Sequence, residues 1–461
     1  MSVIAACRLS LQTRCQSMVG AFPHSITASR WMGTFGIRSV SWPQTALKRI
    51  EARANTHVTT TSSLGINSID ALTKALGTMQ IATDAQQVAA KVIQPTEVHL
   101  APPPLHPRAI HSTSFCTRPV RDGAFRIGVE KKGTQIFIHC YGHGGSGWTT
   151  LFGSISKAIH EFEKANPDKK VPIRVVGAGC MGLTMAIELH RRGYIIAGIY
   201  AAELFNTPSF GAAGYFALVS VKTSKEEQAS LDAIGMDTFL TYKQIEQGKH
   251  GYLGPETVRY MPVYCSKDTK TGLEGLEAQG LIPPRKPVTL NFGNGVVRPD
   301  FYEYQTYFMN TTGLMEGLAK EVARLKIPIE IRKIDKFTDL SETVIANCTG
   351  LGARKLNNDD KMTGVRGSLV AFKRFANAAS STDGRLGHMD YMLYTEVEQD
   401  GEKEYIYLFP KDRAVTLKHP LGCEIEAVIG GTFDPDIDKL SAKEQQMHDK
   451  IQMKRLLDRN A

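Results

Sequence analysis

The sequence predicts an α/β protein with a largely parallel sheet, and three observations lead to this expectation. From about Phe115 onward, short apolar runs of strand character alternate with amphipathic helical stretches. This alternation is typical of parallel sheets, because each helix carries the chain back to the start of the next strand. A glycine-rich turn joins one strand directly to a helix. No apolar run approaches the ~20 residues of a membrane-spanning helix, so membrane insertion is not expected.

Seven runs have the length and composition of strands, and three stretches have helical periodicity. The expected strands are Phe125–Val129, Gln135–His139, Ile173–Val176, Ile195–Ile199, Ile327–Ile331, Thr343–Ala346 and Ile425–Ile429. The expected helices are Thr149–Lys164, Met181–Arg192 and Gly313–Leu325. A chain of 461 residues exceeds the usual size of one domain, so we expect two domains and an extension.

The first 50 residues differ in composition from the rest of the chain. They hold six basic residues and no acidic one, so the remaining chain carries 49 bases against 46 acids. The net charge of +9 therefore belongs mainly to this leader. A nucleic-acid interface, which needs a basic stripe on a folded face, is not indicated. The composition is typical either of a mitochondrial or other organellar transit peptide or of a disordered arm in a cytoplasmic protein, and we expect an intracellular location.

Two further features limit the classes of protein. The eight cysteines are scattered without a C-x-x-C pair, which argues against a metal site, a dithiol motif or a disulfide scaffold. Apolar residues between Ile69 and Met79 have helical spacing, and the proline-rich run 101–107 reads as an extended linker. We therefore expect the main fold to begin just after this linker.

The strongest local motif is a glycine fingerprint between the strand Ile173–Val176 and a helix. Gly177 permits a tight turn, Gly179 allows a pyrophosphate to approach the backbone, and Gly182 lets helix and strand pack closely. The helix N-terminus, which includes Cys180 and Met181, then faces the phosphates. Glu203 follows the next strand, 21 residues after Gly182, where a ribose-binding carboxylate belongs. Together these features predict a dinucleotide site.

Further segments resemble the D-amino acid oxidase family and point to FAD as the dinucleotide. Gly211-Ala-Ala-Gly-Tyr215 is similar to the family's turn beside the flavin ring, which implies that Ala213 and Gly214 contact FAD. Ile331-Arg-Lys-Ile334 resembles the strand against the nucleotide half and implicates Ile334. Ile345-Ala-Asn-Cys-Thr-Gly-Leu-Gly-Ala-Arg354 resembles the segment beside the diphosphate, which assigns Cys348, Thr349 and Gly350 to the cofactor.

The resembling segments occur in a rotated order. Arg118-Pro-Val-Arg121 and His139-Cys-Tyr-Gly-His-Gly-Gly-Ser-Gly-Trp-Thr149 resemble the two motifs that close the family's sequence, yet here they precede the glycine fingerprint. Val365-Arg-Gly367 and Ile429-Gly-Gly-Thr-Phe433 match two later landmarks, and the chain stops one helix after them. The resemblance covers about three quarters of the chain. It predicts a circularly permuted member. The alternatives are a swapped dimer in which one chain completes the other's site, and an out-of-frame remnant of two tandem enzymes whose halves would not pack.

The resemblance also implies roles for individual residues. Arg118 would present two donors to a substrate carboxylate, assisted by the Tyr407 hydroxyl. Gly145 would face the substrate amine, and the same loop would contact FAD through Gly144, Gly147, Trp148 and Thr149. No general base is nominated, and this includes both histidines of the loop, His139 and His143.

Several of these assignments have alternatives. From the residues alone, Arg118 also suits a surface arginine, the glycine-rich loop a flexible connection, and Tyr407 a core aromatic. The family's second active-site tyrosine falls on Lys403, so Tyr405 or Tyr394 is the candidate replacement. A gapless match places Ala202 at the family's ribose-binding acid, one residue before Glu203.

The expected fold is a Rossmann-like FAD-binding domain with an α+β substrate domain that contains a mixed sheet. Residues 1–117 form the extension, 118–220 and 307–356 the cofactor domain, and 221–306 and 357–461 the substrate domain. The expected function is oxidation of a D-amino acid to an imino acid, with dioxygen reduced to hydrogen peroxide. The alternatives are a glycine or N-methyl-amino-acid oxidase or dehydrogenase, and a flavin-binding protein without turnover. A homodimer is compatible with each of these functions.

Overall fold

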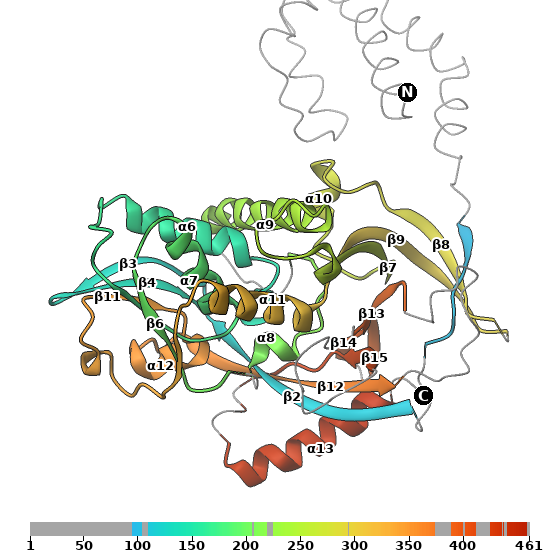
Figure 1. Cartoon of the computed structure of the whole chain (residues 1–461). Coiled ribbons are helices and arrows are strands. Elements are labelled where there is room, and N and C mark those ends of the chain that lie inside the picture. The colour runs from blue at the N-terminus through green and yellow to red at the C-terminus, as the bar shows by residue number, and fades with distance from the viewer. Residues whose placement is uncertain are drawn as a thin grey trace, which may run out of the picture. The chain divides into compact units, whose positions relative to one another are not determined.

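The computed structural model describes residues 95–103, 109–204, 207–218, 225–293, 295–373, 389–399, 402–411, 425–435, 437 and 440–458. The chain divides into two compact units, Met1–Val92 and Ile93–Ala461. The first unit lies outside the described residues, and with it the predicted leader and the predicted helix at Ile69–Met79. The fold below is that of the second unit, drawn in colour in Figure 1.

A six-stranded sheet forms one half of this unit. Its strands lie in the order β10-β6-β5-β11-β4-β3. Their bounds are Ile329–Ile331, Ile196–Ala201, Ile173–Val176, Val344–Asn347, Gln135–Tyr141 and Arg126–Lys132. The first five strands run parallel, and β3 closes the edge antiparallel to β4. Six of the seven predicted strands belong to this sheet, which confirms the expected parallel α/β architecture.

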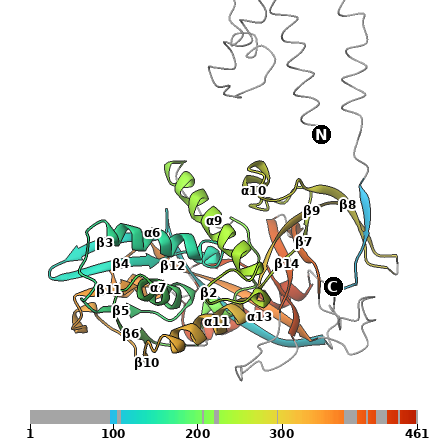
Figure 2. The same cartoon turned by 45° about the horizontal axis from the view of Figure 1, so that its top comes forward.

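Helices cover one face of this sheet (Figure 2). They are α6 (Leu151–Glu163), α7 (Cys180–Arg191) and α11 (Thr311–Arg324), whose ends lie within two residues of the predicted helices. Helix α6 buries Leu151, Ile155, Ile159 and Phe162 along one stripe, the spacing of an amphipathic helix. The long helix α9 (Lys225–Glu246) packs against α6 so closely that a side chain at Gly153 would collide with the backbone at Ile234.

The opposite face of the sheet has a small core of its own. Strand β11 shows the alternation that produces two cores: Ile345 joins Phe137 and Val176, whereas Val344 and Ala346 face the large core. The small core is closed by the segment from Ile334 to Leu340. The short elements nearby are η4 (Phe337–Asp339), η5 (Gly350–Gly352) and α12 (Ala353–Leu356).

A ten-stranded mixed sheet forms the other half. Nine strands lie in the order β1-β8-β9-β7-β13-β14-β15-β12-β16, and β2 also pairs with β12. The bounds in that order are Thr96–His99, Lys286–Asn291, Val297–Met309, Val258–Ser266, Met392–Gln399, Glu402–Pro410, Ile425–Gly430, Met362–Lys373 and Asp434–Pro435, with β2 at Ile110–Arg121. The predicted run Ile425–Ile429 is therefore a strand, but in this second sheet. The remaining short elements are α8 (Pro208–Gly211), α10 (Glu274–Ala278), η2 (Gly144–Ser146) and η3 (Pro255–Thr257).

Strand β2 connects the two halves. It pairs antiparallel with β12 along its whole length. Arg121 lies opposite Met362 at one end of the ladder, and Ile110 lies opposite Phe372 at the other. The last residues of β2 contact the loop after β4. The expected boundary at residue 118 thus falls inside β2, and β1 lies before it. One continuous core, which includes Val175 of the parallel sheet and Phe409 of the mixed sheet, joins the halves.

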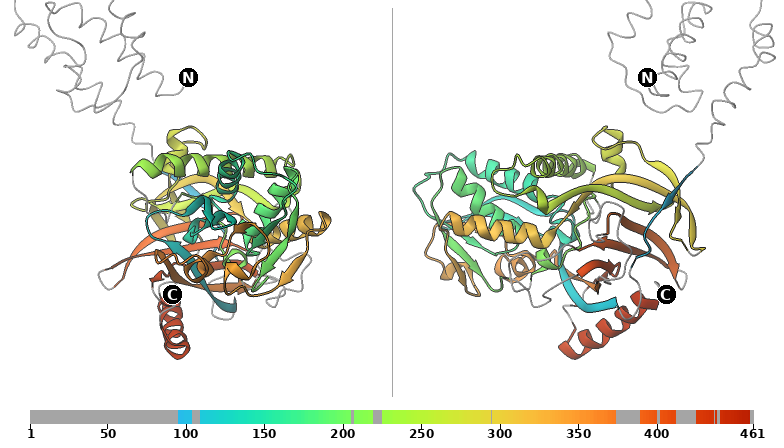
Figure 3. Two further views of the ribbon diagram at one scale, coloured as in Figure 1. Left: turned by 90° about the vertical axis from the view of Figure 1, so that its left-hand side faces the viewer. Right: turned by 45° about the vertical axis from the view of Figure 1, so that its right-hand side comes forward.

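The last helix, α13 (Ala442–Asp458), packs against β12 on the outside of the second sheet (Figure 3). Arg366 of β12 holds it through two hydrogen bonds to Asp449, at 2.7 and 2.6 Å. In the described part of the chain, no helix has the length and apolarity needed to cross a membrane. The same residues contain no group of three or more His, Cys, Asp or Glu arranged to hold a metal ion.

Candidate functional site

The glycine fingerprint forms a turn between β5 and α7. Gly177 has a φ of 110°, a backbone conformation that favours glycine, and a side chain there would collide with the carbonyl oxygen of Cys348. A side chain at Gly182 would collide with the carbonyl oxygen of Gly177. Gly179 is the N-cap of α7, with an extended backbone and no capping side chain of its own. The tight turn and close strand–helix packing that the sequence predicts are therefore both present.

The loop after β4 packs against the start of α7. The Cys180 amide donates to Ser209 Oγ at 3.1 Å, and the Trp148 indole donates to the Ser209 carbonyl at 3.0 Å. A Cβ on Gly147 would lie 3.9 Å from Cys180 Sγ. Cys140 Sγ lies 3.8 Å from the Met181 sulfur, and burial raises the pKa of the Cys180 thiol to about 11. Within one chain, the glycine-rich loop thus lies beside the fingerprint.

The other side of this loop lies along β2. Val120 and His143 form an isolated antiparallel β-bridge, and a Cβ on Gly144 would lie 3.0 Å from the Val120 side chain. Gly144 has a φ of 56°, and Gly145 is exposed at the tip of the loop. Thr149 is buried and donates to the Ser146 carbonyl at 3.0 Å. The loop is therefore placed between the strand of Arg118 and the helix of the fingerprint.

His143 has a structural role in this loop. Its ring is buried, stacks on Phe125 at 4.4 Å and has Nε2 3.1 Å from Ser154 Oγ. Burial lowers the pKa of His143 to about 3, so the ring is neutral at physiological pH. These contacts fix the ring in place within the loop.

A second turn, after β11, closes beside the fingerprint. The Cys348 amide donates to the Val176 carbonyl at 2.9 Å, so the start of this turn lies beside the last residue of the neighbouring strand β5. Gly350 has a φ of 55°, and a Cβ there would lie 3.6 Å from Pro119. Cys348, Thr349 and Gly350 therefore lie between Gly177 and the strand that carries Arg118.

The turn at Ala212–Gly214 is fastened by a lysine that sequence reasoning missed. Lys411 donates from Nζ to the carbonyls of Phe210 and Ala212 and to Thr311 Oγ1, at 3.1, 2.9 and 2.8 Å. Gly214 has a φ of 89°, and its carbonyl accepts from the Met309 amide at 2.6 Å. The only sequence signal for Lys411 was its place at the end of the strand that carries Tyr407.

Arg118 and Tyr407, expected to hold a substrate carboxylate, lie together. The Tyr407 hydroxyl accepts a hydrogen bond from Arg118, whose Nη1 also donates to the Thr432 carbonyl at 3.2 Å. The guanidinium lies against Gly367 and 4.6 Å from the Phe433 ring centroid, and the Tyr407 hydroxyl lies against Gly430. Burial raises the pKa of Tyr407 despite Arg118, which lowers it. The phenol is therefore protonated and able to donate.

Aromatic side chains continue the wall around Tyr407. Tyr394 lies opposite Tyr407 on the paired strand and stacks with Tyr405 at 5.7 Å and 3°. Phe409 stacks on Tyr407 at 4.8 Å. Tyr215, next to the Gly214 turn, lies 5.7 Å from Tyr394. Both candidate replacements for the second tyrosine thus belong to the same aromatic face as Tyr407.

Two predicted cofactor residues follow β6 and β10, the two strands at one edge of the parallel sheet. Glu203 is exposed two residues beyond the end of β6, the strand next to β5. Ile334 is buried with Val176 in the small core beneath the fingerprint. Both positions are compatible with a nucleotide that extends from the fingerprint across the ends of the parallel strands.

The arrangement can accept an anionic dinucleotide at α7 and a carboxylate at Arg118. The N-terminus of α7 carries partial positive charge, which suits a diphosphate. The Cys180 amide already donates to Ser209 Oγ, so the later amides of the first turn remain for an anion. None of the ion pairs between described residues involves Arg118, whose guanidinium donates to Tyr407 and to the Thr432 carbonyl and lowers the pKa of Asp434 electrostatically. The described cysteines, Cys116, Cys140, Cys180, Cys265 and Cys348, are all free thiols.

No family model and no curated protein matches this sequence. Solved structures with a similar fold include the Aspergillus fumigatus fructosamine oxidase Amadoriase II, at 15% identity over 58% of this chain and 64% of that chain, with a TM-score of 0.35. Amadoriase I of the same organism matches at 14% identity over 58% and 63%, with a TM-score of 0.37. Iminodiacetate oxidase from Chelativorans sp. BNC1 matches at 10% identity over 57% and 72%, with a TM-score of 0.36.

The chain thus spans less than two thirds of the length of either amadoriase. At identities of 10 to 15%, these likenesses concern the fold alone.

Proposed function

We propose that this protein is an FAD-dependent oxidoreductase that oxidises a D-amino acid. The observation that carries the proposal is the Arg118–Tyr407 pair. The Arg118 guanidinium, which forms no ion pair with a described residue and has Asp434 in its electrostatic surroundings, lies beside a protonated phenol. The guanidinium lies against Gly367 and the phenol against Gly430. A planar cation with a neighbouring hydroxyl is suited to a carboxylate, which it holds by charge-assisted hydrogen bonds.

The residues around the fingerprint fit FAD. Gly177, Gly179 and Gly182, with the α7 amides, would hold the diphosphate, and Glu203 the ribose. The turns at Cys348–Gly350 and Ala213–Gly214, and the loop Gly144–Thr149, would surround the rest of the cofactor. When bound, FAD supplies a two-electron acceptor for the substrate's α-hydrogen.

In this reaction the protein's own contribution is binding and orientation. Arg118 and Tyr407 hold the carboxylate, which restricts the substrate to one orientation of its Cα–H bond. The substrate enters with an uncharged amine, so no protein base is required. Loss of a hydride from Cα and a proton from nitrogen gives the imino acid, which water hydrolyses to a 2-oxo acid and ammonia. The two electrons and two protons convert dioxygen to hydrogen peroxide.

The rotated order of segments is part of the proposal. It is supported by the contacts of the loop Tyr141–Thr149 with the start of α7 in the same chain. It is also supported by the short connection from α6, which ends at Glu163, to β5, which begins at Ile173. Such a connection requires the joined ends to lie close together, as the termini of compact domains often do. A swapped dimer would instead place this loop on a partner's fingerprint.

The test is the visible absorbance of the purified protein before and after anaerobic addition of D-alanine. We expect a bound flavin spectrum that is bleached by D-alanine and restored by air with release of hydrogen peroxide. Bleaching by glycine or N-methyl amino acids, but not by D-alanine, would identify the alternative substrate class. A flavin that no amine bleaches would leave a binding protein without turnover, and absence of flavin after incubation with FAD would overturn the proposal.

Arg118→Met separates the carboxylate site from the cofactor site. This variant should bind FAD normally and lose the bleaching by D-alanine. Arg298→Met, at an exposed arginine of β9, is the matched control and should behave as the wild type.

A further inference from the structure

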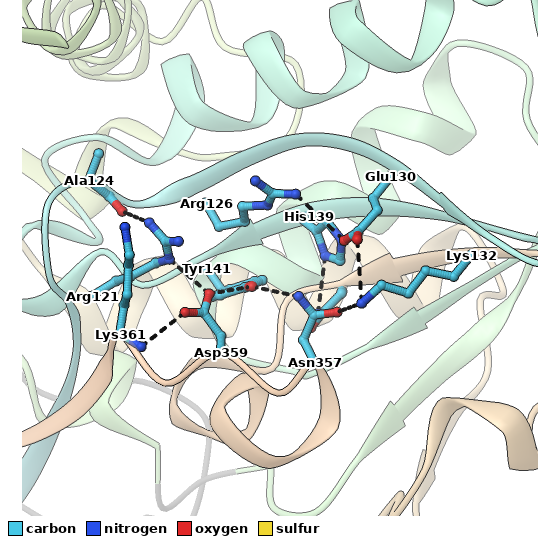
Figure 4. A network of polar contacts seen from close by, with 11 residues as sticks. Arg121, Ala124, Arg126, Glu130, Lys132, His139, Tyr141, Asn357, Asp359 and Lys361 are labelled. Atoms are coloured by element: carbon cyan, nitrogen blue, oxygen red, sulfur yellow. Dashed lines mark hydrogen bonds and ion pairs between the residues drawn. The ribbon is translucent and has the colours of Figure 1, made fainter.

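His139 is buried in the second half of β4, within the polar network of Figure 4. Its Nε2 lies 2.9 Å from Glu130 Oε2 on the neighbouring strand β3. Its Nδ1 lies 3.2 Å from Asn347 Nδ2 at the end of β11. Asn347 Oδ1 in turn accepts from the Thr349 amide at 3.3 Å and from Thr349 Oγ1 at 2.8 Å. A continuous chain of hydrogen bonds therefore leads from a carboxylate to the turn after β11.

The chemistry of these groups gives the chain a direction. An ionised carboxylate only accepts, so Glu130 requires the proton of His139 on Nε2. The neutral imidazole then accepts at Nδ1, where the Asn347 amide must point its NH₂ group. Its carbonyl oxygen consequently points to Thr349, which offers two donors. The tautomer of His139 thus determines which end of the Asn347 amide faces the turn.

The turn that receives this chain lies at the fingerprint. A Cβ on Gly177 would lie 3.4 Å from the Thr349 amide nitrogen, and Thr349 is the N-cap of η5. If Thr349 lost its acceptor, its amide would be left without this bond, and the turn would lose the contact that sets its distance from Gly177. Such an outer contact has the role of the second layer of partners that orients ligand-binding groups.

We propose that His139 is a positioning residue which, through Asn347, holds the Cys348–Gly350 turn in the conformation that binds the cofactor. The inference rests on the proposed FAD site. It assigns His139 no contact with substrate or reacting atoms.

Burial keeps His139 neutral, against the effect of the Glu130 carboxylate. Burial lowers its pKa to about 4; the Glu130 carboxylate raises the pKa, and Arg126 and Lys132 on the same strand lower it. The other rings nearby are Phe137, stacked at 5.7 Å, and Tyr141, edge-on at 5.7 Å. A second proton on Nδ1 would face the Asn347 NH₂ group. The amide would then have to rotate and turn its NH₂ toward the Thr349 amide, where two donors would meet.

The test measures the Kd of FAD by flavin fluorescence in the full-length protein across about pH 6 to about pH 8. Wild type should bind with little pH dependence, because His139 stays neutral there. Asn347→Asp keeps an acceptor for Thr349 but replaces the donor to Nδ1 by a carboxylate. His139 would then lie between two carboxylates, which raises its pKa. Protonated, it donates to both and the chain is intact.

As the pH rises through that higher pKa, the imidazole keeps one proton and leaves one carboxylate facing a lone pair. The stabilisation is present below the raised pKa and lost above it. FAD affinity of Asn347→Asp should therefore fall with rising pH, by about tenfold, the usual effect of one unsatisfied buried polar group. Asn357→Asp is the matched control. Asn357 bonds Tyr141 and Lys132 in the same network without contacting His139, so its FAD affinity should show no such pH dependence.

Two further variants keep the test decisive if Asn347→Asp folds poorly. Thr349→Val removes only the hydroxyl donor, and His139→Gln retains one donor and one acceptor. We expect both to weaken FAD binding by less than His139→Ala does. A Kd for Asn347→Asp and His139→Ala equal to wild type at every pH would overturn the positioning role. Wild type that binds no FAD would overturn the proposed function instead.

Discussion

The guanidinium of Arg118 lies directly against the α-carbon of Gly367, the residue that follows Arg366 on the paired strand β12. A methyl group at position 367 would occupy the space of both terminal nitrogens. Glycine is therefore required there for the arginine to lie flat across the strand, with its Phe433 contact and its bond to Thr432. The same relation holds between Tyr407 and Gly430.

Gly367→Ala should displace Arg118 without removing its charge. We expect kcat/KM for D-alanine to fall by about 100-fold, equivalent to about 2–3 kcal/mol, because a paired charge-assisted contact is lost. The flavin content should be unchanged. Gly275→Ala, in a helix where nothing lies within 4 Å, is the control and should retain full activity. An equal kcat/KM in both variants would show that the position of Arg118 does not matter for catalysis.

Gly177→Ala should weaken cofactor binding. The new methyl group would meet the Cys348 carbonyl in a backbone conformation with a φ of 110°. We expect FAD affinity to fall by at least about tenfold, since strain of this kind costs about 1–3 kcal/mol. Flavin fluorescence measures the Kd. Gly123→Ala, at a φ of 86° with open space around it, imposes backbone strain without a collision and should bind FAD normally.

Lys411→Met should loosen the turn at Ala212–Gly214. The methionine side chain takes the place of the aliphatic part of the lysine, but it leaves the carbonyls of Phe210 and Ala212 without their charged donor. The free energy of unfolding in urea should fall by about 2 kcal/mol, the usual loss for hydrogen bonds to a charged group. Lys355→Met removes an exposed ion pair with Asp335 and should leave the urea midpoint unchanged. A similar midpoint in both variants would contradict a fastening role for Lys411.

Asp359 should make stability depend on pH under acidic conditions. Burial raises its pKa, but hydrogen bonds from Arg121 and Tyr141, both at 2.8 Å, outweigh this and lower it overall (Figure 4). A carboxyl group with a lowered folded-state pKa contributes stability above its unfolded pKa, which is lost as pH falls through the folded value.

The free energy of unfolding should therefore decrease on acidification below about pH 4. Asp359→Asn should be less stable at neutral pH and follow a flatter pH profile. Asp360→Asn, at the exposed neighbouring residue, should keep the wild-type profile. A wild-type profile in Asp359→Asn would show that Asp359 is not the group responsible.

The sequence by itself determined the secondary structure of the parallel sheet, its helices and the glycine turn. These features are local: apolar periodicity over one element is enough to place β5 and α7, and Gly177 is required by the backbone of its own turn. The pairing of β2 with β12 was not predictable in this way, because it joins segments separated by most of the chain. The role of Gly367 depends on that pairing, since only a neighbouring strand places Arg118 above it.

The tertiary structure alone decided the contacts that cross between elements. Lys411 reaches Ala212 because the end of β14 lies beside the start of α11, and His139 reaches Thr349 through Asn347 because β4 and β11 are neighbours. Hydrogen bonds of this kind depend on side-chain direction and on distances of about 3 Å, which no local pattern encodes. The sequence shows the chemical type of each residue, but the packing of the two sheets determines which partner it contacts.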